Sequence, residues 1–207
     1  MQAADDAPKP IFADPTPLGL IGLSVGCAAL LPIAFGVKSA LTADGLRLAA
    51  FFCLFFGAGC QMLAGLMSFA NKNMLGGTLF TAFSFNWVMN YWSLSELSAG
   101  RVPNGAIVLS VDCCFLVVFL VMTVAFGFFS KLLLAFLLDI VVLYVCRIGR
   151  ELFHVQALGL VIAAATVGLM AIALYIAFAL VLNTASGRVM LPMGGPAFLP
   201  KPLSPKG

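Results

Sequence analysis

The chain has 207 residues, of which 62% are hydrophobic and 9% are charged, and its mean hydropathy is +1.11. Soluble domains carry about 25% charged residues, so this composition excludes an ordinary soluble protein and indicates an integral membrane protein. The formal net charge of +3 is small and the basic residues are scattered, which gives no support to nucleic-acid binding.

Apolar stretches long enough to span a membrane follow one another along the chain. A helix needs roughly 20 such residues to cross about 30 Å of hydrocarbon. The predicted helices cover residues 17–37, 46–69, 74–94, 105–128, 132–148 and 156–182. Because every connector is short, the sequence predicts an all-α bundle of six transmembrane helices in a single domain.

The polar and Pro/Gly-rich ends of the chain are expected to be tails. We predict an N-terminal tail over residues 1–13, a transmembrane domain over 14–183 and a C-terminal tail over 184–207. An even number of spans places both tails on one side. The basic residues are divided almost evenly between the two sides, so they do not fix the orientation. We expect a multi-pass protein of the plasma (inner) membrane with both termini in the cytoplasm.

The first helix follows an acid and two prolines, in the stretch DPTPLGL that begins at Asp14. Proline is tolerated in the first helical turn, where its missing N–H would have no partner in any case. We expect Asp14 to be the N-cap, with Pro15 and Pro17 at the first and third helical positions and the Thr16 N–H bonded to the Asp14 carboxylate. The Leu18 N–H and the positive end of the helix dipole then remain free.

Small residues recur at helical spacing in the first two helices. This pattern is typical of close helix packing in lipid, and narrow pores also need small faces. The residues on these stripes are Gly19, Gly22 and Gly26 in the first helix, and Gly57, Gln61, Gly65 and Ser68 in the second.

Polar side chains inside the spans are the informative ones, because each is costly in hydrocarbon. Phe83, Asn86, Trp87 and Asn90 share one face of the third helix, and Gln61 lies at mid-depth in the second. Amides donate and accept hydrogen bonds without fixing a charge, which suits a pore for a small polar solute. The alternative is that these amides only tie helices together.

Two acids lie inside the fourth and fifth predicted helices, Asp112 and Asp139. Intramembrane acids are candidates for a proton relay or an ion path. Each acid could instead be neutral. Alternatively, Asp112 could pair with Arg147, because a tight turn at Phe129 makes the two helices antiparallel and brings those depths together.

The sequence offers no catalytic or metal-binding pattern. The six cysteines all lie in apolar runs without a CxxC pair, and His154 is the only histidine. Neither HExxH nor GxSxG occurs. We therefore predict a protein that is not an enzyme and that needs no cofactor or metal.

Several motifs resemble those of the acetate uptake transporter family, the succinate-acetate permease type. DPTPLGL is similar to the family signature NPAPLGL and keeps Pro15, Pro17, Leu18, Gly19 and Leu20. FFGAGCQMLAGLMSF keeps Gly57, Gln61 and Gly65, and NKNMLGGTLFTAFSFNW keeps Asn73, Phe80, Thr81 and Trp87. Toward the end, Tyr175, Asn183 and LPMG (191–194) are similar in order and spacing.

This resemblance implies a six-helix protomer with its own pore, assembled as a homo-hexamer in lipid, that moves small organic anions with protons or by channel-like conduction. Acetate is the expected solute and succinate a further one. The first motif and inward residues of the other helices would line the path around a hydrophobic constriction. With the polar residues above, the predicted path comprises Asp14, Pro15, Thr16, Pro17, Leu18, Gln61, Phe83, Asn86, Trp87, Asn90 and Tyr175.

The sequence departs from the family pattern at four positions. Asp14 stands where Asn is common, Ser68 replaces a Glu, Phe83 a Tyr and Asn86 a Phe. An ionised Asp14 at the mouth would repel a carboxylate unless it caps its helix or is protonated. A channel for a small neutral solute, such as urea or a short amide, tolerates Asp14 and is the alternative. A third alternative is a non-conducting membrane scaffold, in which packed side chains would fill the pore and no solute would pass.

Overall fold

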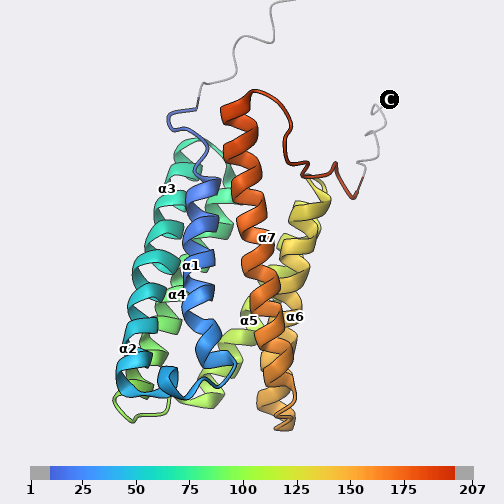
Figure 1. Cartoon of the computed structure of the whole chain (residues 1–207). Helices are drawn as coiled ribbons and strands as arrows, with labels where there is room; N and C mark the ends of the chain where they lie inside the picture. Colours follow the sequence, from blue (N-terminus) through green and yellow to red (C-terminus); the bar gives the residue numbers. More distant parts are fainter. Residues whose placement is uncertain (1–9, 199–207) are drawn as a thin grey trace, which may run out of the picture. The chain divides into compact units, whose positions relative to one another are not determined.

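The computed structural model describes residues 10–198, and within that range the regular structure is entirely helical. The chain divides into two compact units, the first ending at Val102 and the second beginning at Pro103. Figure 1 shows the elements of each unit. The predicted all-α class is therefore confirmed, and each unit is described by itself.

The first unit contains α1 Thr16–Ala34, the short 3-10 helix η1 Lys38–Leu41, a middle stretch and α4 Met74–Ser98. The middle stretch consists of α2 Ala43–Phe52, η2 Cys53–Cys60 and α3 Gln61–Ala70. α1 packs against η2 and α3, while α4 packs against α2, η2 and α3. In Figure 1 the middle stretch is one continuous rod, with the π-helical segment η2 between two α-helices.

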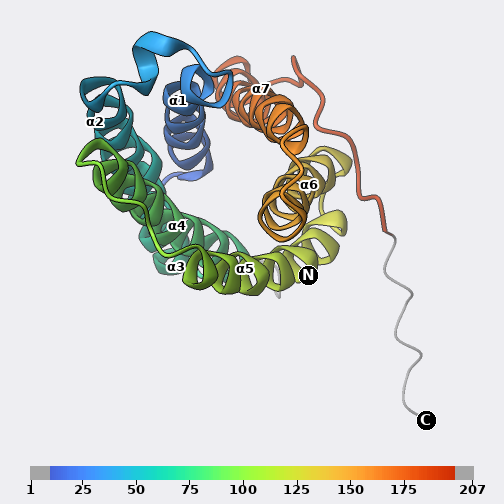
Figure 2. The same cartoon turned by 90° about the horizontal axis from the view of Figure 1, so that it is seen from below.

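The second unit contains three long helices, α5 Gly105–Gly127, α6 Lys131–Phe153 and α7 Leu158–Ser186. α6 packs against both α5 and α7. This middle position of α6 is visible in Figure 2, which looks along the helices. The tight turn predicted near Phe129 is present, because only residues 128–130 separate α5 from α6.

Each of the six predicted spans falls on a helical stretch, but α4 differs from the others. Within residues 10–198, five stretches are long and apolar enough to cross a membrane: Thr16–Ala34, Ala43–Ala70, Gly105–Gly127, Lys131–Phe153 and Leu158–Ser186. α4 has 25 residues, which is ample length. Its composition is less apolar because it carries Asn86, Asn90 and Glu96. The prediction of six spans is thus confirmed in part.

Four of the helices begin at residues whose side chains can accept a backbone N–H. Such an N-cap satisfies one of the donors that a helix start leaves unpaired. The hydrogen bonds are Gly45 N to Thr42 Oγ1 (3.1 Å), Gly76 N to Asn73 Oδ1 (2.9 Å), Ile107 N to Asn104 Oδ1 (3.2 Å) and Leu132 N to Ser130 Oγ (3.1 Å). These N-cap hydrogen bonds explain why the predicted connectors end, and the helices begin, at these residues.

The glycine stripes predicted for close packing lie where helices touch. A Cβ atom added at Gly22 would lie 2.3 Å from the Cys60 Cβ and 2.5 Å from the Phe56 carbonyl oxygen. Likewise, added Cβ atoms at Gly26 and Gly57 would lie 2.8 Å and 2.5 Å from the Trp87 ring. Gly22 thus allows α1 to approach η2, Gly57 allows α4 to approach η2, and Gly26 allows α1 to approach α4. This is expected when packing rather than hydrophobic drive associates helices in lipid.

The π-helical segment η2 is stabilised by α4. A π-helix makes i to i+5 hydrogen bonds and is rare, occurring often at functional sites. Here the Ser84 hydroxyl of α4 donates to the Ala58 carbonyl oxygen at 3.0 Å. This contact supplies a partner for one backbone carbonyl inside η2 and joins η2 to α4.

The predicted C-terminal tail is partly helical, because α7 continues to Ser186. The helix then ends at Gly187, whose φ of 65° lies in the left-handed region that glycine adopts most easily. Residues 188–198 form an irregular segment, here called the C-terminal strap. In Figure 1 it leaves α7 and reaches the turn between α5 and α6.

The C-terminal strap is hydrogen-bonded to all three helices of the second unit. Its contacts with the turn are Ser130 Oγ to Met193 O (2.6 Å), Lys131 N to Gly195 O (2.9 Å) and Ala197 N to Gly127 O (2.8 Å). On α7, the Asn183 side chain binds the backbone of the next residues through Met190 N (2.7 Å), Leu191 N (3.0 Å) and Leu191 O (2.9 Å). The strap thus caps the end of α5 and the start of α6.

Asn183→Ala is expected to release the C-terminal strap while the helices stay folded. The substitution removes three hydrogen bonds, each worth about 1 kcal/mol in net terms, so the strap should lose about 2 to 3 kcal/mol of local stability. Hydrogen exchange of residues 188–198 in detergent would measure the loss. Thr184→Ala is the matched control, because Thr184 is an exposed residue in the same last turn of α7. Unchanged exchange in Asn183→Ala would show that Asn183 does not hold the strap.

Candidate functional site

The start of α1 differs by one residue from the prediction. The helix begins at Thr16, and Pro15, whose φ of −82° and ψ of −4° are already helical, is the N-cap in place of Asp14. The Pro15 carbonyl accepts the Gly19 N–H at 3.2 Å, which fixes this start. The predicted bond is nevertheless confirmed, because the Thr16 N–H donates to Asp14 Oδ1 at 2.9 Å. Pro17 is the second helical residue rather than the third.

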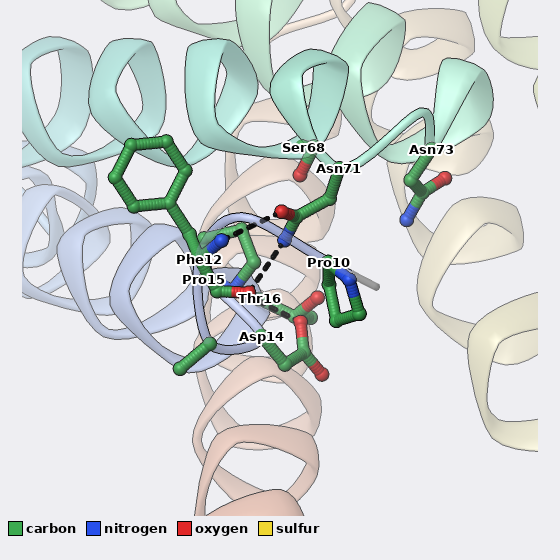
Figure 3. A pocket seen from close by; sticks show the side chains of 9 residues that line it. Pro10, Phe12, Asp14, Pro15, Thr16, Ser68, Asn71 and Asn73 are labelled. Carbon is green, nitrogen blue, oxygen red and sulfur yellow. Dashed lines mark hydrogen bonds between the residues drawn. The ribbon is translucent and has the colours of Figure 1, made fainter. Parts of the chain in front are cut away.

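A cavity of about 330 Å³ lies at this end of the first unit, at the N-terminus of α1. Figure 3 shows how residues before α1, the end of α3 and the start of α4 surround it. The lining residues are Pro10, Phe12, Ala13, Asp14, Pro15, Thr16, Ser68, Asn71 and Asn73. We call this cavity the α1 pocket.

Asn71 fixes the arm of chain that precedes α1. The Phe12 N–H donates to Asn71 Oδ1 at 2.8 Å, and Asn71 Nδ2 donates to the Phe12 carbonyl oxygen at 2.9 Å. Figure 3 shows both bonds as dashed lines. This pairing uses both polar atoms of the amide, so Asn71 shapes the wall of the α1 pocket rather than offering a group to a solute. Asn73 is similarly engaged through Oδ1, which accepts the Gly76 N–H.

Ser68 offers a polar group at the floor of the α1 pocket. Its side chain is 1% exposed, and its hydroxyl has no hydrogen-bond partner in the described part of the chain. Buried polar groups in native proteins are almost always paired with protein, water or ligand. A hydroxyl can donate to a carboxylate or accept from an amide. The α1 pocket therefore combines the Ser68 hydroxyl, the positive end of α1 and the negative Asp14 carboxylate.

Two further unpaired polar atoms lie in the interior of the first unit. Gln61 is 1% exposed and lies two helical turns before Ser68 on the same stripe of α3; its Oε1 has no partner among residues 10–198. The Trp87 Nε1 is also buried without a partner in that range, and its ring lies against Gly26 and Gly57. One of these atoms is an acceptor and the other a donor, so each can bind a polar group of a small solute or a water.

The predicted polar face of α4 is turned to the interior. Phe83, Asn86 and Trp87 are buried, while Asn90 is half-buried. The path residues at the start of α1 are more accessible, with Leu18 exposed and Thr16 and Pro17 half-buried. Whether these residues line a solute path stays a prediction.

The predicted residues of the second unit have different surroundings. Arg147 Nη2 lies 3.1 Å from Asp112 Oδ2, which confirms the pairing of these two residues. Asp139 is half-buried, with Oδ2 unpaired among the described residues, and an added Cβ at Gly168 of α7 would lie 2.9 Å from Asp139 Oδ1. The Tyr175 hydroxyl donates to the Pro192 carbonyl at 3.0 Å, so Tyr175 binds the C-terminal strap.

Among the described residues, no group of three or more His, Cys, Asp or Glu side chains is arranged to hold a metal ion. The six cysteines are all free thiols, and Cys113 and Cys114 are exposed on α5.

The sequence predicted Asp14, Pro15 and Thr16 of the α1 pocket, but not the part that Phe12, Asn71 and Ser68 play in it. Phe12 and Asn71 gave no periodic or motif signal, because one precedes the first helix and the other lies in a turn. Ser68 did give a signal, since it follows Gln61 by seven residues on one helical stripe. Its position at the end of the second predicted helix becomes informative only when that end is paired with the start of the first.

Comparisons with known proteins find similarity to a transport protein and to a channel. No family model matches the chain. Over 85 residues it is 32% identical to the ammonia transport outward protein 3 of Saccharomyces cerevisiae, a match that covers 41% of this chain and 30% of the yeast protein. The fold is similar to the structure of the bacterial acetate channel SatP, with a TM-score of 0.78 and 23% sequence identity over 88% of this chain and 99% of that one.

Proposed function

We infer that the chain belongs to the acetate uptake transporter family and acts as a membrane transporter or channel for small monocarboxylates. The chain is a multi-pass integral membrane protein with five strongly apolar membrane-length stretches in its described part. The observation that carries the proposal is the shared fold with an acetate channel over 88% of the chain. The sequence motifs at the start of α1 and in the next two spans support it, as does the similarity to the yeast protein.

The first unit offers part of a route for the solute. It would enter at the α1 pocket, where the Ser68 hydroxyl can hydrogen-bond a carboxylate oxygen. It would then pass the unpaired polar atoms of Gln61 and Trp87. These groups would replace part of the hydration that the solute loses.

A proton is expected to accompany the anion. Moving a bare carboxylate through a low-dielectric constriction is prohibitive unless donors or a neutralising charge go with it. Asp112 and Asp139 are the candidate proton carriers, because both lie inside helices of membrane length. Succinate is a further candidate substrate. Family resemblance also supports a homo-hexamer in which each protomer has its own pore.

A neutral solute is the second candidate, and Asp14 favours it. A carboxylate at the mouth of the α1 pocket opposes the entry of an anion but does not oppose urea or a short amide. The name of the yeast relative adds ammonia to the small solutes worth testing.

Uptake into proteoliposomes separates these functions. The purified protein would be tested with labelled acetate, succinate, urea and methylammonium, with and without a proton gradient. We expect acetate uptake above that of empty vesicles and faster uptake when the outside is acidic. Urea uptake without acetate uptake would establish the neutral-solute channel instead. If no solute entered faster than in empty vesicles, both functions would be excluded and a scaffold role would remain.

Asp14→Asn is expected to raise acetate uptake at neutral pH about three- to fivefold. The asparagine Oδ1 can still accept the Thr16 N–H, whereas the negative charge, worth about 1 kcal/mol against an anion some 4 Å away in water, is lost. Initial rates in proteoliposomes measure the change, with Asp44→Asn as the control. Asp44 is an exposed carboxylate of the same unit outside the α1 pocket. Unchanged acetate uptake would mean that Asp14 serves only the start of α1.

A further inference from the structure

The ion pair in the second unit is buried but incomplete. Asp112 is the eighth residue of α5 and is 4% exposed. Its Oδ2 lies 3.1 Å from Arg147 Nη2, while its Oδ1 is buried and has no partner within the described range. The contact therefore joins one carboxylate oxygen to one guanidinium nitrogen. A bidentate pair, the stronger arrangement for these groups, would engage both oxygens.

The guanidinium is more accessible than its partner. The Arg147 side chain is 24% exposed, against 6% for that of Asp112. The guanidinium lies over the Tyr144 ring, with the central carbon 5.4 Å from the ring centroid. The Tyr144 hydroxyl is buried and without a partner in the part of the chain that the structure describes. Arg147 is thus fixed from one side by an aromatic ring and retains donors for a second acid.

Few other charges surround this pair. On α5, Asp112 is the only acidic or basic residue between Gly105 and Gly127, and α7 has none between Leu158 and Ser186. On α6, Arg150 and Glu151 follow Arg147, with Glu151 close to Gly105 at the start of α5. Lys131 and Asp139 lie further back on α6. The other titratable side chains on these helices are Cys113, Cys114, Tyr144, Cys146 and Tyr175.

We propose that Arg147 binds the carboxylate of the transported acid and that Asp112 is its internal competitor. This inference rests on the proposed function. When a proton from solution binds Asp112, the ion pair is broken and Arg147 is free to pair with the solute carboxylate. When the solute leaves, Asp112 releases its proton and pairs with Arg147 again.

The charges of the two states support this exchange, in which the solute carboxylate replaces Asp112 as the partner of Arg147. The resting pair has one negative and one positive charge, and the loaded state has a neutral Asp112, a positive Arg147 and a negative solute. Both states are neutral, so the loaded state adds no net charge to the low-dielectric interior. The exchange moves one proton with each carboxylate. A bidentate contact between guanidinium and solute would repay the loss of the single contact to Asp112.

Two variants separate the proton from the anion. Asp112→Asn, which cannot be ionised, should make acetate uptake in proteoliposomes independent of external pH, whereas the wild type should be faster at acidic pH. Arg147→Gln would leave Asp112 as an unpaired buried charge and could unfold. The double variant Asp112→Asn/Arg147→Gln removes both charges, so it should fold and yet lose acetate uptake about tenfold or more.

Binding gives a readout that does not depend on flux. Acetate should raise the melting temperature of the wild type at acidic pH only, that of Asp112→Asn at acidic and neutral pH, and that of the double variant at neither. Arg150→Gln is the matched control, because Arg150 is an exposed arginine of the same helix, and it should behave as the wild type.

The outcomes distinguish this inference from the proposed function. A wild-type pH response in Asp112→Asn, or wild-type acetate uptake in the folded double variant, would overturn the exchange mechanism while leaving acetate transport in place. A wild-type protein that neither binds nor takes up acetate would overturn both.

Discussion

Gly22→Ala is expected to destabilise the first unit by about 3 kcal/mol, the upper end for overpacking a well-packed interior. The added methyl group would lie 2.3 Å from the Cys60 Cβ and 2.5 Å from the Phe56 carbonyl oxygen. The second contact is with backbone, which cannot move aside as a flexible side chain can. α1 would have to separate from η2 and lose packing along its length. Thermal unfolding of the purified protein in detergent would show the loss as a lower melting temperature.

Gly59→Ala provides the matched control, because it adds the same methyl group within η2. The nearest atom to a Cβ at Gly59 is the Leu54 carbonyl oxygen at 3.6 Å, an ordinary contact. Alanine is also the better helix former by about 1 kcal/mol, so this variant should be as stable as the wild type or more so. Equal melting temperatures for the two variants would contradict the close approach of α1 and η2.

Gln61→Leu is expected to lower acetate uptake at least about tenfold without lowering the melting temperature. A hydrogen bond to a charged group contributes about 1.5 to 3 kcal/mol, and its loss at the highest barrier corresponds to a tenfold or greater fall in rate. Leucine has a similar size and removes a buried acceptor that has no protein partner among residues 10–198. The substitution should therefore change the stability of the folded protein little. Initial rates in proteoliposomes and unfolding in detergent measure the two effects.

The two readings of Gln61 give opposite results in this variant. If the amide only ties helices together, Gln61→Leu should lower the melting temperature and leave the uptake per folded protein unchanged. Gln61→Glu adds a test of charge, because a carboxylate at this position should oppose acetate more than urea. Normal acetate uptake by both variants would remove Gln61 from the solute path.

Local patterns along the chain predicted much of the fold. Helical periodicity and the length needed to cross hydrocarbon placed a helix in each predicted span. The antiparallel turn at Phe129 made a pair of Asp112 and Arg147 one of the alternatives for Asp112, because two antiparallel helices joined by a short turn match residues at equal depth, and this ion pair is present. The bond between the Thr16 N–H and Asp14 was predictable for the same reason, since its partners are two residues apart.

The exact ends of the helices were harder to predict, as was the way in which α4 accommodates its polar residues. The N-cap of α1 lies one residue later than expected because Pro15 already has helical φ and ψ angles. α7 continues to Ser186, where a glycine permits the turn. α4 keeps its helix despite the buried Asn86 because it packs against α2, η2 and α3. Tertiary packing overrides local preference in such cases.

The sequence by itself determined the membrane class, the helices and the residues that could carry charge or hydrogen bonds, because these follow from composition and from spacings of three or four residues. Only the tertiary structure decided how those residues are used. Asn71 binds Phe12 across 59 residues to form a wall of the α1 pocket, and Ser130 binds Met193 across 63 to hold the C-terminal strap. Contacts at such separations leave no periodic mark on the chain, since they depend on how helices pack and not on how each one forms.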